Sequence, residues 1–184
     1  MRLPKKIIAL HDAFTSAEIP HAFGGALALA WCTQQARGTI DIDVNLFIGQ
    51  HHAQRVLAAL PRGVRWDDPD RADLERVGQT RLWWEETPVD VFLSTTEFHE
   101  RVGTHVRWEP FEGKQLPFLS CIDLAVFKAM FSRTRDWADL EDMAVAGTLD
   151  RPAVLGILVD ALGTSDPRIE RLRSLPRPDD ELSV

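Results

Sequence analysis

The pattern of apolar and polar positions divides the chain into a first part that mixes helical and extended segments and a second part that is helical. Apolar residues three or four apart indicate a helix, and strict alternation indicates a strand with one buried face. For residues up to 60 these patterns predict a helix over 4–18, an extended segment at 21–23, an alanine-rich helix to about 35, a strand over 40–48 and a helix over about 51–60. A hairpin of two strands is predicted over 78–85 and 88–93. A short helix capped within 94–97 and one or two strands within 105–118 are predicted to follow. Residues 67–76 carry five acidic and two basic side chains and are expected to form a loop.

The second part is expected to consist of helices followed by a polar tail. The expected helices start near Ser120, Arg135, Pro152 and Ser165. The prediction is therefore an α+β fold, with an α/β core over residues 1–118, a helical part over 119–175 and a flexible tail over 176–184.

Two carboxylates share one face of the strand predicted over 40–48. Ile40, Ile42 and Val44 face one side, and Asp41 and Asp43 face the other. Two like charges so close repel each other, and their joint ionisation is costly without a counter-cation. A hard divalent cation such as Mg²⁺, held by carboxylates and substrate phosphates, meets that need. Taken alone, however, an Asp-x-Asp strand is often only a solvated face.

The glycine pair Gly24-Gly25 stands at the start of the alanine-rich helix. Because glycine has no side chain, backbone amides here could approach a ligand, and a helix N-terminus favours phosphate. A glycine pair is more often a structural turn. Here, however, the glycine pair precedes the strand with Asp41 and Asp43, and a phosphate-binding turn followed by metal-binding carboxylates is typical of phosphoryl or nucleotidyl transfer. If the predicted hairpin pairs beside the Asp strand, Asp90 joins them, and three carboxylates could hold two metal ions, with Asp90 as base for an incoming hydroxyl.

These motifs resemble a known superfamily. Phe23-Gly24-Gly25, a spacer of 15 residues and Asp41-Ile42-Asp43-Val44 are similar to the signature of nucleotidyltransferases related to DNA polymerase beta. The run Arg37-Gly38-Thr39-Ile40-Asp41-Ile42-Asp43 looks more closely like the AbiEii-type toxin nucleotidyltransferases and their stand-alone relatives. The resemblance implies the minimal nucleotidyltransferase fold, a small mixed sheet flanked by helices, with a C-terminal helical part.

A second block of the chain resembles the same group. Lys128, Arg133 and Asp136 stand in a helical stretch like the one in which that group carries a Lys, a downstream Arg and an Asp-x-x-Asp. The resemblance implies that these three residues and Arg37 bind the nucleotide. Each has another interpretation. Lys128 could extend to solvent, Arg133 could complement a helix C-terminus, Asp136 with Asp139 could cap a helix, and Arg37 could pair with the aspartates.

Composition and charge limit the class of protein. The net charge of −7 argues against binding nucleic acid by bulk electrostatics, although a local basic groove remains open. No signal peptide is visible, and no stretch approaches the roughly 20 apolar residues of a membrane span. Cys32 and Cys121 lie in apolar surroundings and are expected to be reduced and buried, as in a cytoplasmic protein.

The sequence thus predicts a cytoplasmic, Mg²⁺- or Mn²⁺-dependent enzyme that moves a nucleoside monophosphate from an NTP such as ATP to an acceptor hydroxyl. The toxin-like resemblance implies tRNA or a protein as acceptor, and a cognate antitoxin as partner. One alternative is an antibiotic-modifying nucleotidyltransferase. Another is a non-catalytic nucleotide-binding or antitoxin-like protein on the same fold. The sequence indicates neither the preferred NTP nor the oligomeric state.

Overall fold

The computed structural model describes residues 1–36 and 38–176, which fold as two compact units. Unit 1 comprises residues 1–27 and 38–119, and unit 2 comprises residues 28–37 and 120–184. The helix α2 (Gly25–Thr33) begins in unit 1 and continues into unit 2. Within the described ranges, none of the helices is both long and apolar enough to cross a membrane.

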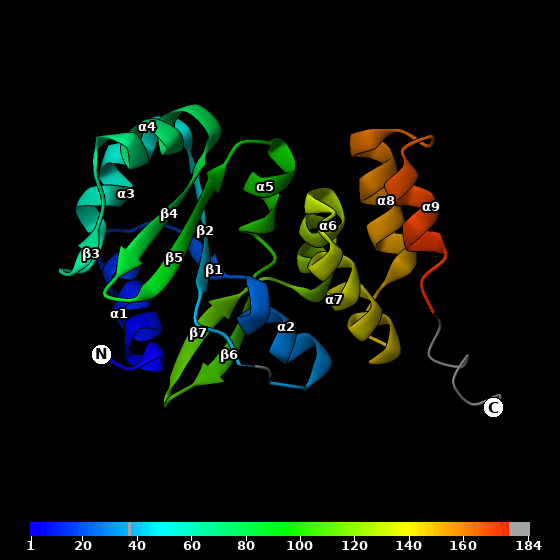
Figure 1. Cartoon of the computed structure of the whole chain (residues 1–184), viewed down its shortest axis with the longest axis horizontal. Coiled ribbons are helices and arrows are strands. Elements are labelled where there is room, and N and C mark those ends of the chain that lie inside the picture. Colours follow the sequence, from blue (N-terminus) through cyan, green and yellow to red (C-terminus); the bar gives the residue numbers. More distant parts are fainter. Residues whose placement is uncertain (37, 177–184) are drawn as a thin grey trace. The chain divides into compact units, whose positions relative to one another are not determined.

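Unit 1 is a mixed β-sheet with helices. Besides the first residues of α2, its elements are α1 (Leu3–Ser16), β1 (His21–Phe23), β2 (Ile42–Gly49), the 3₁₀ helix η1 (Gln50–His52), α3 (Ala53–Ala59), β3 (Val64–Arg65), α4 (Asp68–Val77), β4 (Gln79–Trp84), β5 (Thr87–Ser94), α5 (Glu97–Val102), β6 (Arg107–Phe111) and β7 (Lys114–Phe118). The described strands form one seven-stranded sheet in the order β3-β4-β5-β2-β1-β7-β6 (Figure 1). The β2–β5 and β1–β7 pairs are parallel, and the others are antiparallel. The α+β prediction with a small mixed sheet is confirmed.

Strand β2 lies inside the sheet and has two different faces. Ile42, Val44 and Leu46 are completely buried in the core. Asp43 and Phe47 lie on the other face, because side chains alternate along a strand. Phe47 packs edge to face against His99 of α5, with ring centroids 5.9 Å apart. Helix α5 therefore covers one end of the face that carries Asp43 at the other.

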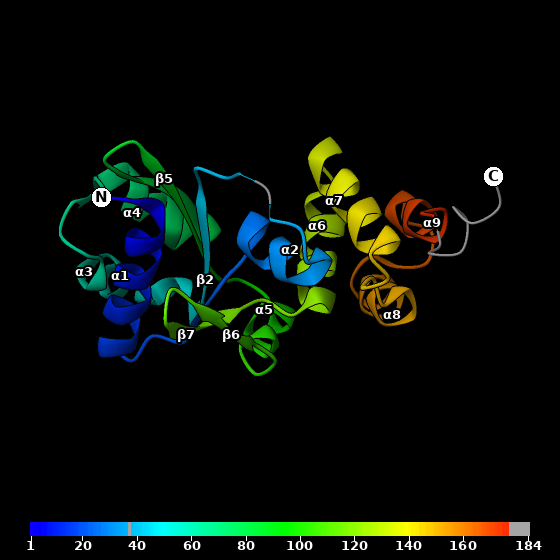
Figure 2. The ribbon, with the colours of Figure 1, turned by 90° about the horizontal axis from the view of Figure 1, so that it is seen from below.

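Unit 2 is helical. Its elements are the later part of α2, α6 (Cys121–Phe131), α7 (Thr134–Val145), α8 (Arg151–Leu162) and α9 (Pro167–Arg173). Figure 2 shows α8 and α9 next to each other. Trp137 is a fully buried side chain of this unit, and the guanidinium of Arg171 lies 4.4 Å from the centre of a Trp137 ring. Helix α6 begins at the predicted N-cap, because the Ser120 hydroxyl accepts a hydrogen bond from the Asp123 N–H.

The segment expected to be a loop over 67–76 is a helix, so that prediction is wrong. Helix α4 starts with a reciprocal capping box, in which Asp67 and Asp70 each accept a hydrogen bond from the other's backbone N–H. It ends at Gly78, whose φ is +73°. Only Leu74 is buried in it. A highly charged helix with one buried side chain lacks the apolar periodicity on which the prediction rested.

Two details of the predicted Asp strand are also wrong. The strand begins at Ile42, so Asp41 precedes it. Ile40 is 72% exposed and does not share the buried face of Ile42. The alternation of side chains holds only where neighbouring strands continue the hydrogen-bonded ladder, and the pairing with β5 begins at Ile42.

The expectation that both cysteines are reduced is wrong as well. Cys32 and Cys121 form a disulfide within unit 2, with their Cα atoms 5.7 Å apart. The two residues are separated by 89 positions in the sequence. The end of α2 and the start of α6 bring them together, and local sequence patterns contain no information on that approach.

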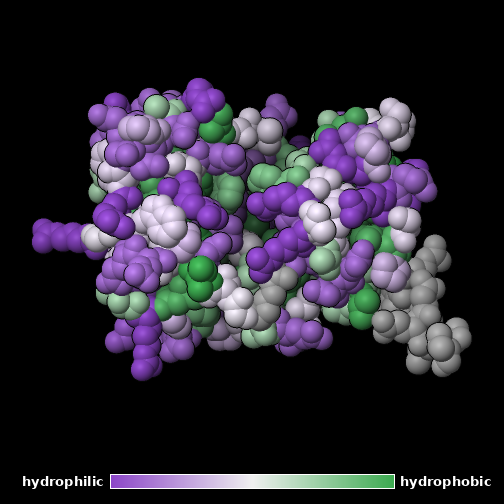
Figure 3. All heavy atoms as spheres, in the orientation of Figure 1, coloured by the Kyte–Doolittle hydropathy of each residue, from purple (hydrophilic) through white to green (hydrophobic). Residues whose placement is uncertain are grey.

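Polar side chains cover much of the face of the molecule shown in Figure 3, with smaller apolar areas between them. This distribution agrees with a chain in which 27% of the residues are charged. The described residues 1–36 and 38–176 thus place their apolar side chains mainly in the cores of the two units.

Candidate active site

The candidate site in unit 1 forms where β2 and β5 run side by side. Asp43 of β2 and Asp90 of β5 stand directly opposite each other in the parallel register. Neighbouring strands lie about 4.8 Å apart, so both carboxylates project from the same face at close range. The pairing of the hairpin with the Asp strand, on which the role of Asp90 depends, is therefore confirmed. Asp41 reaches the same place from the segment before β2.

Gly24 and Gly25 pass directly over Asp43. The Gly24 N–H donates a 2.9 Å hydrogen bond to the Asp43 carbonyl oxygen. A Cβ atom on Gly25 would lie 1.9 Å from Oδ2 of Asp43, and the φ of Gly25 is +52°. A Cβ on Gly24 would lie 2.9 Å from the buried Asn45 amide. Gly25 is therefore needed for the approach that places the start of α2 against the Asp43 carboxylate, and Gly24 leaves room for the Asn45 side chain.

Arg81 is a component of this site that the sequence analysis missed. It lies on β4 opposite Asp90 in the antiparallel register. Its Nε and Nη2 atoms each donate a 2.7 Å hydrogen bond to Asp90, and Nη2 lies 3.7 Å from Oδ2 of Asp41. The hydrogen bonds to Asp90, together with the charges of Asp90, Asp41 and Asp43, raise the pKa of Arg81. Asp90 and Asp41 thus lie against one guanidinium, and the charge of Asp43 acts on it as well. Cross-strand spacing in the hairpin was the signal that could have revealed it.

The donors suit a divalent cation in kind, because carboxylate oxygens are the ligands that Mg²⁺ prefers. In the conformation seen here, no group of three or more His, Cys, Asp or Glu side chains within the described ranges is arranged to hold a metal ion. The Arg81 guanidinium is the cation among these carboxylates, and both Asp90 oxygens accept hydrogen bonds from it. The chemistry of Asp43 and Asp90 thus fits a metal ion, whereas in this conformation Arg81 occupies both oxygens of Asp90.

A second charged cluster lies in unit 2. Lys128 of α6 is 6% exposed, and its ammonium bonds to Asp139 and lies 3.7 Å from Asp136 of α7. Asp136 also accepts hydrogen bonds from the backbone N–H and the Nε of Arg133 at the start of α7. Lys128 does not extend to solvent, and Asp136 caps its helix. The predicted role of Lys128, Arg133 and Asp136 in nucleotide binding stays a prediction. Arg37, predicted with them, lies outside the described residues.

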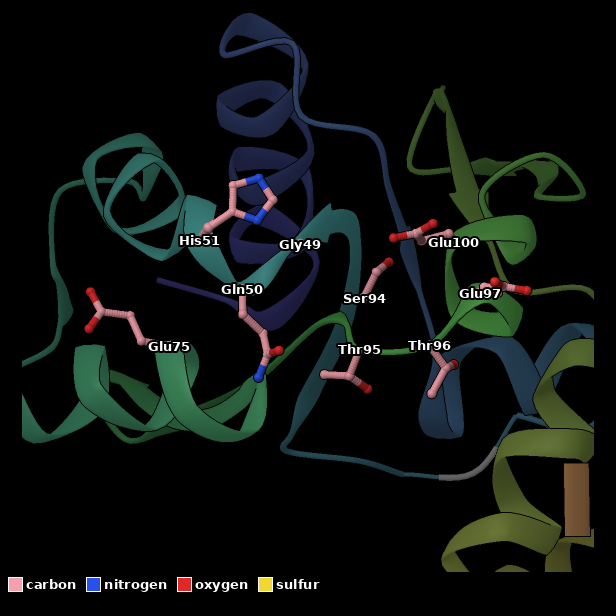
Figure 4. A pocket seen from close by; sticks show the side chains of 9 residues that line it. All are labelled: Gly49, Gln50, His51, Glu75, Ser94, Thr95, Thr96, Glu97 and Glu100. Atoms are coloured by element: carbon pink, nitrogen blue, oxygen red, sulfur yellow. The ribbon is translucent and has the colours of Figure 1, made fainter.

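A separate pocket of about 600 Å³ lies at the other end of β2 and β5 (Figure 4). The residues around it are Gly49, Gln50, His51, Glu75, Ser94, Thr95, Thr96, Glu97 and Glu100. Gly49 is six residues after Asp43, which corresponds to about 20 Å along a strand. This pocket is therefore distinct from the carboxylate site and does not present its lining to Asp43.

The fold of the chain is similar to those of known structures, whereas its sequence has no close match. No protein-family model matches the chain, and no curated protein matches its sequence. The solution structure of the antibiotic-resistance factor ANT(2'')-Ia aligns with a TM-score of 0.56 at 12% identity, covering 86% of this chain and 89% of that one. The crystal structure of an antigenic nucleotidyltransferase-like protein from Paracoccidioides brasiliensis aligns with a TM-score of 0.52 at 13% identity, covering 96% and 94%.

The chain has a nucleotidyltransferase-like fold. The likeness extends over most of both proteins, so it includes the sheet that carries Asp43 and Asp90 as well as helices of unit 2. At such identities it establishes the fold, and the reaction has to be argued from the side chains of the site.

Proposed function

We propose that this protein is a metal-dependent nucleotidyltransferase whose active site is formed by Asp41, Asp43, Asp90, Gly24 and Gly25. The observation that carries the proposal is the contact of Gly25 with the Asp43 carboxylate. This contact brings the start of α2, where Gly25 has no side chain, next to the carboxylates of Asp43 and Asp90, which lie opposite each other on neighbouring strands. A phosphate group at the helix start would therefore lie beside the carboxylates that bind a cation.

Each residue has a distinct part in the proposed reaction. Gly24 and Gly25 leave the backbone open for the triphosphate. Asp43, Asp90 and Asp41 would hold Mg²⁺ or Mn²⁺, which would supply positive charge at the phosphoryl oxygens and would lower the pKa of the acceptor hydroxyl. The acceptor oxygen attacks the α-phosphorus, the bond from that phosphorus to the bridging oxygen breaks, and pyrophosphate leaves. Asp90 takes the proton of the acceptor hydroxyl.

For the acceptor, we propose tRNA or a protein, in a toxin–antitoxin setting with a cognate antitoxin. The support is the resemblance of the Arg37–Asp43 run and of the Lys128–Asp139 block to AbiEii-type toxins. A second candidate is the modification of an antibiotic, supported by the structural likeness to an antibiotic-resistance factor. The acidic pocket of Figure 4 does not favour this candidate, because it lies at the end of β2 remote from Asp43.

The acceptor is tested by incubating the protein with Mg²⁺ and each α-labelled NTP in the presence of total tRNA, cell protein, a panel of antibiotics, or no acceptor. We expect the label to appear in one macromolecular fraction with wild type and to be lost with Asp43→Ala. The matched control is Asp73→Ala, which removes an exposed aspartate paired with Arg76 on α4. Label on the antibiotic alone would replace the toxin proposal by the second candidate.

A further inference from the structure

The side chain of Arg81 is 51% exposed, and it contacts a carboxylate of the proposed active site that is more deeply placed. The side chain of Asp90 is 17% exposed, and its two oxygens accept the two hydrogen bonds of the Arg81 fork. Bidentate Arg–carboxylate pairs are among the stronger charge-assisted interactions. The same Nη2 atom also approaches Asp41, which comes from a different segment of the chain.

The position of Arg81 is set by the fold. Antiparallel pairing of β4 with β5 places Arg81 opposite Asp90, and parallel pairing of β5 with β2 places Asp90 opposite Asp43. Residues opposite each other project from the same face of a sheet. The guanidinium is therefore held on the face where the carboxylates gather, and it supplies the positive charge that close carboxylates need.

Arg81 and a metal ion would compete for the same oxygens. A cation held by Asp43 and Asp90 needs lone pairs of Asp90, and both Asp90 oxygens accept hydrogen bonds from Arg81. The same contacts hold the Asp90 oxygens away from an acceptor hydroxyl.

We propose that Arg81 is an internal counter-cation that closes the carboxylate site, and that a divalent metal binds only as the guanidinium leaves Asp90. This inference rests on the proposed function in taking these carboxylates as the metal site. In this account Arg81 is a positioning residue that holds Asp90 in place while no substrate is bound. The same contact lowers the affinity of the site for a metal ion. A purely structural cross-strand pair would have no effect on metal affinity once the fold is intact.

The test is direct Mn²⁺ binding to the full chain without nucleotide, measured by the loss of the free Mn²⁺ electron paramagnetic resonance signal. Arg81→Gln removes the charge and is expected to bind Mn²⁺ about two- to fivefold more tightly than wild type, the range expected for loss of an ion pair whose arginine is half-exposed. Arg76→Gln, which removes the arginine of an exposed pair on α4, should leave the affinity unchanged. Unchanged or weaker binding by Arg81→Gln would overturn the inference.

Two further variants keep the test decisive. Arg81→Lys retains the charge but loses the fork, and we expect a smaller gain in affinity; it replaces Arg81→Gln if that variant fails to unfold cooperatively. In Arg81→Gln with Asp43→Asn the gain should disappear, whereas a gain that persists would place the metal elsewhere and contradict the inference.

Metal binding is measured without turnover, so the failure of this inference and the failure of the proposed function can be told apart. If Arg81→Gln binds Mn²⁺ more tightly but wild type transfers no nucleotide, the role of Arg81 stands and the proposed function is refuted. If wild type transfers nucleotide but Arg81→Gln has unchanged Mn²⁺ affinity, the proposed function stands and the role of Arg81 is refuted.

Discussion

The α-carbon of Gly25 faces the carboxylate of Asp43 so closely that a methyl group there would lie 1.9 Å from Oδ2. The start of α2 and the strand β2 thus approach each other closely at Gly25 and Asp43. Gly25 also has a φ of +52°, which an L-residue with a side chain rarely adopts.

Gly25→Ala should lower both stability and activity. The left-handed backbone costs roughly 1 kcal/mol for alanine, and the clash with Asp43 adds roughly 1–2 kcal/mol. Gly113→Ala is the matched control, because Gly113 has a φ of +82° and no atom lies within 4 Å of the place that an alanine methyl group would take. Urea unfolding measures both variants. Equal losses of stability in the two would show that the contact with Asp43 has no energetic consequence.

Lys128→Met should destabilise unit 2 strongly. It removes the ammonium that balances the charges of Asp139 and Asp136, which are 1% and 3% exposed, and breaking a buried ion pair costs about 3–5 kcal/mol. Adding Asp139→Leu should restore part of that loss. Thermal unfolding of the single and double variants measures it. No recovery in the double variant would mean that the destabilisation does not come from the buried charges.

Reduction of the disulfide between Cys32 and Cys121 should lower the melting temperature. The bond closes a loop across 89 positions, and the chain-entropy model gives a stabilisation of up to roughly 4–5 kcal/mol for such a loop. Calorimetry with and without a phosphine reductant measures the effect. The Cys32→Ala, Cys121→Ala double variant should melt at the lower temperature under both conditions. A wild-type melting temperature that the reductant leaves unchanged would contradict a stabilising bond.

Stability should fall as the pH is lowered from 6.5 towards 4. Burial lowers the pKa of His21 and of His99 to about 4 from the ordinary 6.5. The folded state keeps these rings neutral, so the unfolded state binds more protons in this window, and the free energy of unfolding decreases as pH falls. Above 6.5 the contribution is fully present. Each ring accounts for up to roughly 3 kcal/mol.

Urea titrations between pH 4.5 and 7.5 measure this dependence. In His21→Gln the slope between pH 6.5 and 4.5 should be shallower than in wild type, because one titrating group is lost. His51→Gln changes an exposed histidine and should keep the wild-type slope. A wild-type slope retained by His21→Gln would contradict the contribution of that ring.

The sequence predicted the main elements of the sheet because apolar alternation is strong there. Val89, Val91 and Leu93 are buried, and Asp90 lies on the opposite face next to Asp43, as the alternation indicated. The helix from Cys121 was predicted by its cap residue Ser120, and the short helix at 97–102 was predicted from the run 94–97, in which Thr96 is the N-cap. These features are local, and local patterns determine them.

The features that the sequence analysis missed depend on long-range pairing or on charge. Helix α4 is held by its capping box rather than by an apolar stripe. The Cys32–Cys121 bond joins two distant segments. Arg81 on β4 reaches Asp90 on the neighbouring β5 and Asp41 beyond β5, so only the order of the strands in the sheet places it. The glycine pair was recognised, but its contact with Asp43 became visible only in the folded chain.

The most direct test of the proposed activity is the fate of the two ends of a labelled NTP. With Mg²⁺ and an acceptor fraction, wild type should transfer the α-phosphate label to the acceptor and release the γ label as pyrophosphate. Asp43→Asn should reduce both signals by roughly 10²-fold or more, because it removes a charge that holds the metal, while Asp73→Asn should leave them unchanged. Transfer of the γ label, or α-label transfer that persists in Asp43→Asn, would contradict the account.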